Sequence, residues 1–353
     1  MSVTVDRVLA NLTTLRLGGP AGRLVEATSE AQIVGALVDA DAAGDPLLLL
    51  GGGSNVVIAD AGFPGTVIQI ANRGVSTESA GDRVQLTAAA GEPWAELVAR
   101  AMTDGLAGLE CLAGIPGSVG ATPIQNVGAY GQQVSDTIVS VRVYDRRAGR
   151  IVDLQHGECA FGYRSSVFRG LARHVVLGVT FELERSSLAR PIVYPDLARS
   201  LEVEPDSRRP LPEVVEAVLA LRRQKGMVLD PGDPESVSAG SFFVNPVMSR
   251  ERFAQLEWRS VERLGPTLSP PRWPRPDGNV KTSAAWLIEH AGFTRGYGAG
   301  RVGISNKHML ALVNRGGAST AELIALAREI RAQVQRVFGV ELSPEPTLVG
   351  VEL

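Results

Sequence analysis

Residues 113–136 read AGIPGSVGATPIQNVGAYGQQVSD, and the rest of the chain is organised around this stretch. It is rich in glycine, nearly free of charge, and repeats with neither the helix period nor the strand period. Apolar side chains spread through it, among them Ile115, Val127 and Tyr130, argue against disorder. Closely spaced glycines let the main chain approach a ligand and align N–H groups toward an anion. Composition alone therefore favours a cradle for a large phosphate-bearing ligand about as strongly as a tight packing loop.

A second glycine-rich segment, residues 51–55, lies between two apolar runs at 47–50 and 56–58. A dinucleotide-binding fingerprint would need GxGxxG at the opening of a helix, and this segment lacks it. An ordinary hairpin turn needs only about two residues, so contact with a phosphate or a ring edge is the favoured interpretation. A GxGxxG match at 298–303 is interpreted as chance, because the flanking sequence is not strand followed by helix.

Length and composition limit the function. A chain of 353 residues with 44% hydrophobic and 21% charged residues predicts two or three soluble domains. The net charge of −3 gives no electrostatic reason to expect nucleic acid or an anionic membrane as partner. Two cysteines and four scattered histidines form no disulfide framework and no metal motif. Because the N-terminus lacks the pattern of a signal peptide and no apolar run could span a membrane, we expect a cytoplasmic protein.

The pattern of predicted elements indicates an α+β fold. Residues 23–183 read as many strands with few helices, without the regular alternation of a doubly wound sheet. Capping boxes predict helices from Ser29 and from Ser319. The first 22 residues read as irregular, and the segment 194–197 reads as a loop.

Several segments together resemble the UDP-N-acetylenolpyruvoylglucosamine reductase family. They are GGGSNVVI (51–58), GLECLAGIPGSVGATPIQNVGAYG (108–131), FGYRSSVF (161–168), YPDL (194–197), AGSFFVNP (239–246), AAWLIEHAGF (284–293), ISNKHMLALVN (304–314) and SPEP (343–346). They occur in the family's order and cover the chain from near Asn11 to its end. The YPDL segment is similar to that of the longer type of this family (the MurB family), which places a tyrosine loop over the substrate.

The resemblance implies an α+β flavoprotein of the vanillyl-alcohol-oxidase (PCMH-type) fold with three domains. FAD-binding subdomain 1 is expected at residues 1–72, with 339–353 returning to it. Subdomain 2 is expected at 73–226 and a substrate-binding α+β domain at 227–338. The protein is expected to be a cytoplasmic monomer that binds neither nucleic acid nor membrane.

The resemblance also implies an FAD-dependent oxidoreductase with NADPH as co-substrate. NADPH reduces FAD, and the enolpyruvyl ether of UDP-N-acetylglucosamine then replaces NADP and becomes UDP-N-acetylmuramate for peptidoglycan synthesis. A hydride from flavin N5 reaches the vinyl carbon, and Ser241 gives a proton to the α-carbon. Arg164 binds the carboxylate through its guanidinium fork, and Glu345 assists at the same end. Glu345 is expected to be protonated or paired to a cation in the complex.

The remaining site residues follow from the same motif matches. The cofactor-binding residues are Gly51, Gly52, Gly53, Ser54, Asn55, Ile115, Pro116, Gly117, Ser118, Gly120, Ala121, Gln125, Asn126, Gly128 and Ala129. The substrate-binding residues are Tyr130, Tyr163, Tyr194, Arg222, Lys225, Asn245 and His290. Tyr194 and Lys225 are expected at the diphosphate of the UDP sugar or at the phosphates of the nicotinamide cofactor, and His290 stands where relatives are expected to carry glutamine. The resemblance implies no metal.

Two other functions are compatible with parts of the pattern. A flavin oxidase of the same fold would not share the set of Arg164, Ser241 and Glu345, and often tethers its flavin through His or Cys. The cofactor segments of this chain lack histidine. A flavin- or nucleotide-binding module without activity would give a yellow protein that NADPH cannot bleach.

Overall fold

The computed structural model describes residues 2–170 and 173–353. The chain forms two compact units, each assembled from separate stretches of sequence. Unit 1 comprises residues 1–7, 21–53 and 64–228. Unit 2 comprises residues 8–20, 54–63 and 229–353.

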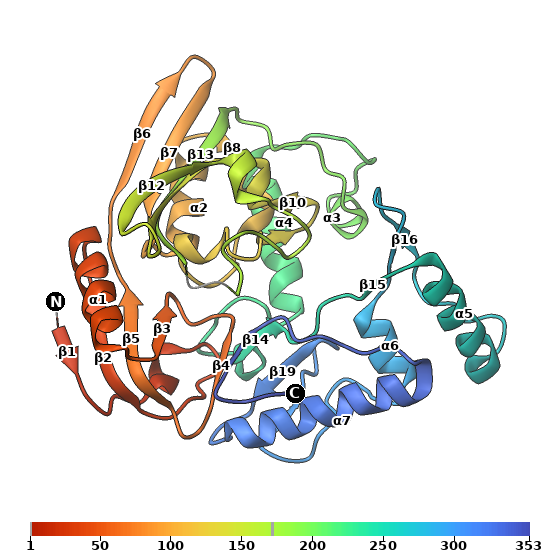
Figure 1. Cartoon of the computed structure of the whole chain (residues 1–353). Coiled ribbons are helices and arrows are strands. Elements are labelled where there is room, and N and C mark those ends of the chain that lie inside the picture. The colour runs from red at the N-terminus through yellow and green to blue at the C-terminus, as the bar shows by residue number, and fades with distance from the viewer. Residues whose placement is uncertain (1, 171–172) are drawn as a thin grey trace. The chain divides into compact units, whose positions relative to one another are not determined.

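Unit 1 begins with a four-stranded sheet. Its strands are ordered β1 (Ser2–Thr4), β2 (Ala21–Ala27), β5 (Phe63–Ile70) and β3 (Leu47–Leu50). Helix α1 (Glu30–Ala43) lies along this sheet (Figure 1) and buries Ile33 and Leu37 in a core shared with Ile68. Ser29 begins α1 by accepting a hydrogen bond from the main-chain N–H of Gln32. The first 22 residues, expected to be irregular, thus contribute strand β1 through antiparallel pairing with β2.

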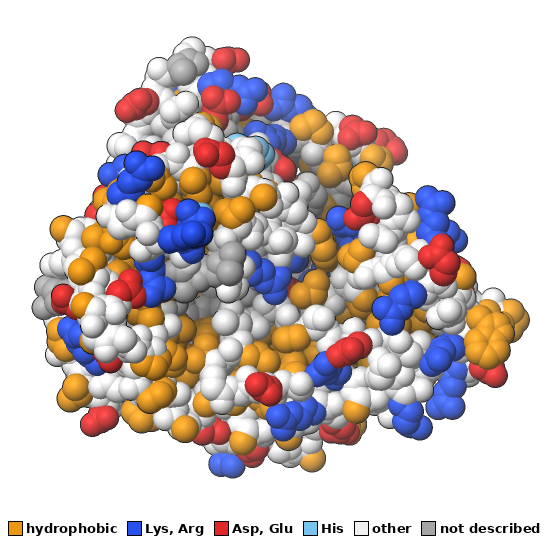
Figure 2. Space-filling model, in the orientation of Figure 1, with side chains coloured by type: hydrophobic (Ala, Val, Ile, Leu, Met, Phe, Trp, Pro, Cys, Tyr) orange, Lys and Arg blue, Asp and Glu red, His pale blue; other side chains and the backbone are white. Residues whose placement is uncertain are grey.

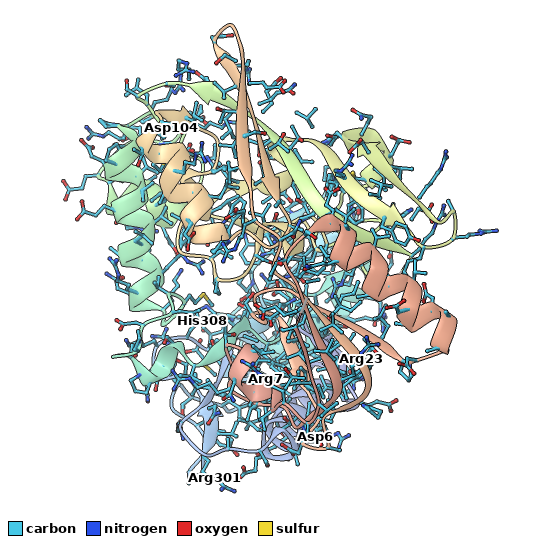
Figure 3. The ribbon with its side chains drawn as sticks, turned by 90° about the vertical axis from the view of Figure 1, so that its left-hand side faces the viewer. Asp6, Arg7, Arg23, Asp104, Arg301 and His308 are labelled. Carbon is cyan, nitrogen blue, oxygen red and sulfur yellow. The ribbon has the colours of Figure 1, made fainter. Side chains whose placement is uncertain are left out.

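The second sheet of unit 1 is antiparallel. Its strands are ordered β12 (Arg150–Gln155), β11 (Ile138–Asp145), β13 (His174–Arg185), β7 (Arg83–Ala89) and β6 (Val75–Ala80), and β8 (Leu106–Ala107) also pairs with β13. Helices α2 (Trp94–Thr103) and α4 (Leu211–Gln224) contribute to one core with this sheet (Figure 3, where Asp104 marks the end of α2). Trp94 is fully buried there, with its ring 5.9 Å from that of Phe181. Ala113, Val119 and Val134 of the glycine-rich stretch are buried in this core.

Short elements lie just before, within and beyond the glycine-rich stretch. They are η2 (Glu110–Leu112), η3 (Val119–Ala121), β9 (Gly128–Ala129), β10 (Gln132–Gln133), η4 (Val134–Asp136) and, farther on, η5 (His156–Cys159). The loop expected at 194–197 is instead the start of helix α3 (Pro195–Ser200). Pro195 occupies the first helical turn, where its fixed φ is favourable and its missing N–H costs nothing. Burial of Leu197 and Ala198 then holds the short helix in place.

Unit 2 contains three small sheets. One has the order β14 (Ser238–Ser241), β19 (Ala311–Asn314) and β18 (Val302–Ile304); another has β15 (Val247–Met248), β17 (Val280–Lys281) and β16 (Trp273–Pro274); the third pairs β20 (Thr347–Val349) with β4 (Val56–Ile58). Its helices are η1 (Leu9–Leu12), η6 (Pro234–Ser236), α5 (Arg250–Leu264), α6 (Ala284–His290) and α7 (Thr320–Phe338). The parallel β20–β4 pair returns the C-terminal segment to residues near the start of the chain.

Helix α7 forms the base of unit 2 and lies beside β19 in Figure 1. Its capping box at Ser319 and Glu322 is present as the sequence predicts, and Gly339 ends it with φ 70°. The apolar face carries Leu323, Ile330 and Val334, all fully buried. The periodic pattern in the sequence therefore places this helix against the core that carries β14 and β19.

Charges of both signs are interspersed over the face drawn in Figure 2. No helix within residues 2–170 and 173–353 is long and apolar enough to cross a membrane. The described residues also contain no group of three His, Cys, Asp or Glu side chains placed to hold a metal ion. Cys111 and Cys159 are both buried free thiols.

Candidate functional site

The two glycine-rich segments approach each other main chain to main chain inside unit 1. A Cβ atom on Gly52 would lie 2.7 Å from the Cα of Gly117, and one on Gly51 would collide with the Ser118 hydroxyl. Strands β3 and β4, which flank residues 51–55, belong to different sheets, so the segment is not the turn of a hairpin between them. The approach leaves main chain rather than side chains at the meeting point.

The glycines also adopt backbone conformations that suit an anion cradle. Gly53 has φ 60° and Gly117 has φ 116°, values that L side chains rarely adopt. The stretch is anchored from behind, because Trp94 donates its main-chain N–H to Gly117 and Gly120 donates to Ala90. A rigid cradle without bulky side chains fits the diphosphate and ring edges of FAD.

Arg164 lies at the tip of a tight turn. Gly162 and Ser165 exchange main-chain hydrogen bonds of 2.9 and 3.3 Å across this turn, and Arg164 has φ 52°. Its Nη2 donates to the carbonyl oxygen of Gly128 at 3.0 Å, and its guanidinium lies 5.7 Å from the ring centre of Tyr163. The structure thus places Arg164, the residue predicted to bind the substrate carboxylate, against the main chain of the glycine-rich stretch.

A second set of predicted residues meets elsewhere in unit 1. We call Tyr130, Tyr194, Arg222 and Lys225 the tyrosine cluster. The rings of Tyr130 and Tyr194 lie edge to face with centroids 5.4 Å apart. The Lys225 ammonium lies 5.6 Å from the centre of the Tyr130 ring and 3.9 Å from a carboxylate oxygen of Asp196. Four residues from three segments of the sequence therefore lie close together.

The tyrosine cluster has unusual electrostatics. Arg222 is 7% exposed, and its Nη2 donates to the carbonyl oxygen of Met227 at 2.7 Å. Its Nε is buried without a hydrogen-bond partner among the described residues, and burial lowers the pKa of Arg222 to about 10. Burial raises the pKa of Tyr130 to about 12, although the nearby Arg222 charge opposes this shift. A guanidinium whose charge acts on the nearby Tyr130 phenol is a favourable partner for an anionic ligand.

Ser241 and Glu345 come together in unit 2 through the main chain. Ser241 ends β14, and the next residues pair with residues 343–345. The N–H of Glu345 donates to the carbonyl oxygen of Phe242 at 2.8 Å, and that of Val244 donates to Ser343 at 3.0 Å. Two residues far apart in sequence thus lie on adjacent extended segments.

Asn55 is linked to the same segment. Its side-chain amide donates to the carbonyl oxygen of Glu345 at 3.4 Å, and its own carbonyl oxygen accepts from the N–H of Thr347 at 3.0 Å. The end of the glycine-rich turn is therefore connected to the C-terminal segment within unit 2.

Asn245 and His290 serve the local structure of unit 2. The Asn245 Oδ1 accepts a hydrogen bond from the first N–H of α6, at Ala284, over 2.9 Å. His290 closes the same helix, stacks on Trp286 at 4.2 Å between centroids, and its Nδ1 lies 2.9 Å from the Trp286 carbonyl oxygen. Asn245 and His290, both predicted to bind the substrate, thus lie at opposite ends of α6. Each of them uses one polar side-chain atom in a hydrogen bond to the main chain of α6.

Sequence reasoning missed Glu110 and Gln132. Glu110 is fully buried, and its carboxylate accepts a hydrogen bond from Gln132 Nε2 at 2.8 Å. The signal was present in the sequence, because a carboxylate stands in the otherwise apolar run at 109–113.

Two family models match the chain. The model of the UDP-N-acetylenolpyruvoylglucosamine reductase C-terminal domain matches residues 233–349, and that of an FAD-binding domain matches residues 21–155. The chain is 57% identical to UDP-N-acetylenolpyruvoylglucosamine reductase of Thermobifida fusca over 346 residues, covering 98% of this chain and 97% of that protein. It is 56% identical to the protein of the same name from Streptomyces coelicolor over 350 residues, covering 99% and 90%.

A solved structure aligns with nearly the whole chain. The crystal structure of the MurB reductase from Thermus caldophilus aligns with a TM-score of 0.66 at 25% identity, covering 99% of this chain and 100% of that one. The predicted α+β, FAD-binding fold class is thereby confirmed.

Proposed function

Because the chain belongs to the UDP-N-acetylenolpyruvoylglucosamine reductase family, we propose that it uses NADPH to convert the enolpyruvyl ether of UDP-N-acetylglucosamine into UDP-N-acetylmuramate. The chain is an FAD-binding oxidoreductase of peptidoglycan precursor synthesis. The observation that carries the detailed proposal is the main-chain pairing of the residues that follow Ser241 with the segment 343–345, which contains Glu345.

The glycine-rich segments 51–55 and 113–129 would hold the cofactor. Close approach of Gly52 to Gly117 and the left-handed backbone of Gly53 supply a cradle without side chains. When bound there, FAD supplies the hydride that reaches the terminal vinyl carbon of the substrate. The remaining tasks are to bind the substrate, to stabilise charge on its carboxylate and to protonate its α-carbon.

Ser241 protonates the α-carbon in this proposal. Hydride addition at the vinyl carbon leaves a negative charge shared between the α-carbon and the carboxylate, as an enolate. The Ser241 hydroxyl then breaks its O–H bond as the new C–H bond forms, because an enolate carbon is a strong base. Its place at the end of β14 is set by main-chain pairing, so the hydroxyl needs no side-chain support.

Arg164 and Glu345 act at the substrate carboxylate. A guanidinium binds a carboxylate through two parallel hydrogen bonds and stabilises the charge that grows there. The contact between Arg164 and the Gly128 carbonyl oxygen orients the fork before substrate arrives. Glu345 accordingly carries a proton or pairs with a cation when the substrate carboxylate is close.

The tyrosine cluster binds the diphosphate of the substrate. Lys225 and the buried Arg222 supply positive charge, and Tyr130 and Tyr194 supply phenolic hydroxyl groups that burial keeps neutral. The charge of Arg222 supports this role, because a guanidinium close to an anion stabilises it.

We also propose the coarser organisation of the enzyme. FAD-binding subdomains are proposed at 1–72 and 73–226 and a substrate domain at 227–338. The pairing of β20 with β4 returns the C-terminal segment to residues 56–58, which belong with residues 229–353 to unit 2. The enzyme acts as a monomer in the cytoplasm, where NADPH and nucleotide sugars are available.

An anaerobic spectral titration tests the function. NADPH is expected to bleach the FAD absorbance, and the enolpyruvyl UDP sugar is expected to restore it without oxygen. Restoration by oxygen but not by the UDP sugar would indicate a flavin oxidase. A yellow protein that NADPH cannot bleach would indicate a binding module.

A further inference from the structure

Glu110 is a buried carboxylate for which the proposed reaction has no use. Its side chain is fully buried at the start of η2, next to buried Leu109 and Leu112. An ionised carboxylate in such a place is costly unless hydrogen bonds replace the lost water. The donors to the Glu110 carboxylate therefore show which segments it holds together.

Three donors from three separate segments of unit 1 meet at this carboxylate. Its Oε2 accepts from the N–H of Gly108 at 2.6 Å, and its Oε1 accepts from Gln132 Nε2 at 2.8 Å and from the N–H of Arg190 at 2.7 Å. Gln132 is fixed in turn, because its Oε1 accepts from the N–H of Cys111 at 2.9 Å. Charge-assisted hydrogen bonds are about twice as strong as neutral ones, so this node is rigid.

The link to Gln132 holds a strained turn that carries Tyr130. Gln132 pairs with Ala129 in the β9–β10 hairpin, and Tyr130 and Gly131 form its tip. Their φ values are 47° and 88°, as in a type I′ turn. Glycine adopts this conformation freely, but a tyrosine in it is strained. The surrounding structure must hold Tyr130 there.

The link to Arg190 holds the approach to Tyr194. The chain runs from Arg190 directly to Val193 and Tyr194, and Val193 Cγ2 would lie 2.6 Å from a Cβ atom on Gly131. The two segments therefore touch at the tip of the hairpin. The Glu110 carboxylate therefore binds both segments that carry the rings of the tyrosine cluster.

We propose that Glu110 is a positioning residue that fixes Tyr130 against Tyr194 and thereby sets the diphosphate-binding geometry of the substrate site. The inference rests on the proposed function, since it assumes that the tyrosine cluster binds the diphosphate of a UDP sugar. Glu110 touches neither substrate nor cofactor and acts only through Gln132 and the Arg190 main chain.

The test measures UDP binding to the full-length, FAD-loaded protein by calorimetric titration. In Glu110→Gln one oxygen becomes an NH₂ group, which must face at least one N–H donor in either orientation. The dissociation constant for UDP is expected to rise about tenfold, the effect of one lost buried hydrogen bond. Gln132→Met provides a second variant that cuts the same network and keeps the Glu110 carboxylate, and it should weaken UDP binding similarly.

Asp145→Asn is the matched control. Asp145 is also a buried carboxylate of unit 1, and it accepts from the N–H groups of Arg147 and Ala148 and from the Arg173 guanidinium. This variant should lower the melting temperature and leave the dissociation constant for UDP unchanged. A purely structural role for Glu110 would instead make UDP affinity follow stability in all variants.

Two results would overturn the inference alone. One is wild-type UDP affinity in both Glu110→Gln and Gln132→Met; the other is an equal loss of affinity in Asp145→Asn. A wild-type protein that does not bind UDP at all would overturn the proposed function and the inference together.

Discussion

The tyrosine cluster of unit 1 and the Ser241–Glu345 pair of unit 2 are held by different means. In the cluster, side chains hold one another through an edge-to-face ring contact, a cation over a ring and a buried guanidinium. In the pair, main-chain hydrogen bonds between residues 242–244 and 343–345 hold together the two segments that carry the side chains.

The pair proposed to act in the chemical step and the cluster proposed to bind the substrate are thus held in different ways. A side chain placed by its main chain can be changed without moving its neighbours, so its loss removes only its own function. A side chain held by other side chains acts together with them. A single substitution in the cluster therefore removes only part of the binding and also shifts the neighbouring side chains. Substitutions should therefore affect the two regions in different ways and to different extents.

The largest effect is expected for Ser241→Ala. Loss of a general acid costs typically about 10²–10⁴-fold, so turnover of the enolpyruvyl UDP sugar should fall by about 10³-fold. Reduction of bound FAD by NADPH and the melting temperature should remain as in the wild type. Rapid-mixing measurements of the two half-reactions separate these quantities.

Ser343→Ala is the control for this experiment, because Ser343 is an exposed serine in the opposing segment. It should turn over normally. If Ser241→Ala also turned over normally, Ser241 could not be the acid.

Arg164→Lys should have the next largest effect. Lysine keeps the charge but cannot bind a carboxylate through two parallel hydrogen bonds, and it cannot reproduce the contact with the Gly128 carbonyl oxygen. We expect kcat for the enolpyruvyl sugar to fall about 10²-fold, as for the loss of one donor to a developing negative charge.

The exposed Arg147 provides a control, as Arg147→Lys should change nothing. Equal kcat values in Arg164→Lys and the wild type would remove Arg164 from the reaction.

Lys225→Met should affect binding rather than chemistry. Loss of a hydrogen bond to a charged group costs about 1.5–3 kcal/mol, so the dissociation constant for UDP should rise roughly 10- to 100-fold. Single-turnover reduction at saturating substrate should be nearly unchanged. The neighbouring Arg223 is exposed on the same helix, and Arg223→Met removes the same charge without contacting Tyr130. Equal effects in the two variants would show that only net charge matters.

The smallest effect concerns the ionisation of Tyr130. Burial raises its pKa to about 12, whereas an unfolded tyrosine ionises at about 10. Between these values only the unfolded chain releases the proton, so stability should fall as the pH rises above about 10. Tyr130→Phe removes this contribution, and its unfolding free energy should depend less on pH in that range. Tyrosinate absorbance of the wild type minus that of the variant should titrate near 12, and a midpoint near 10 would contradict the burial of the phenol.

The sequence was sufficient for the features that depend on local chemistry. The glycine-rich stretch, the run at 47–50 and the capping box at Ser319 follow from composition, periodicity and spacing, and the structure contains them as predicted. The segment 194–197, expected to be a loop, instead begins helix α3, because a proline is favourable in the first turn of a helix.

The rest depends on contacts between distant residues. Glu110 meets Arg190 from 80 positions away, and no local pattern marks that hydrogen bond. The contact of Tyr130 with Tyr194 and the pairing of Phe242 with Glu345 are equally non-local. The resemblance named Tyr130, Tyr194 and Glu345, but only the fold shows how each one is held.

The most direct test of the central claim is the origin of the hydrogen at the α-carbon of the product. The reaction is run once in D₂O with NADPH and once in H₂O with NADPH that carries deuterium at its transferable position, and the product is examined by NMR. Protonation by the exchangeable Ser241 hydroxyl predicts deuterium at the α-carbon in D₂O and none there from labelled NADPH. Deuterium at the α-carbon from labelled NADPH would contradict the account, because the hydride would then have reached the carbon assigned to the proton.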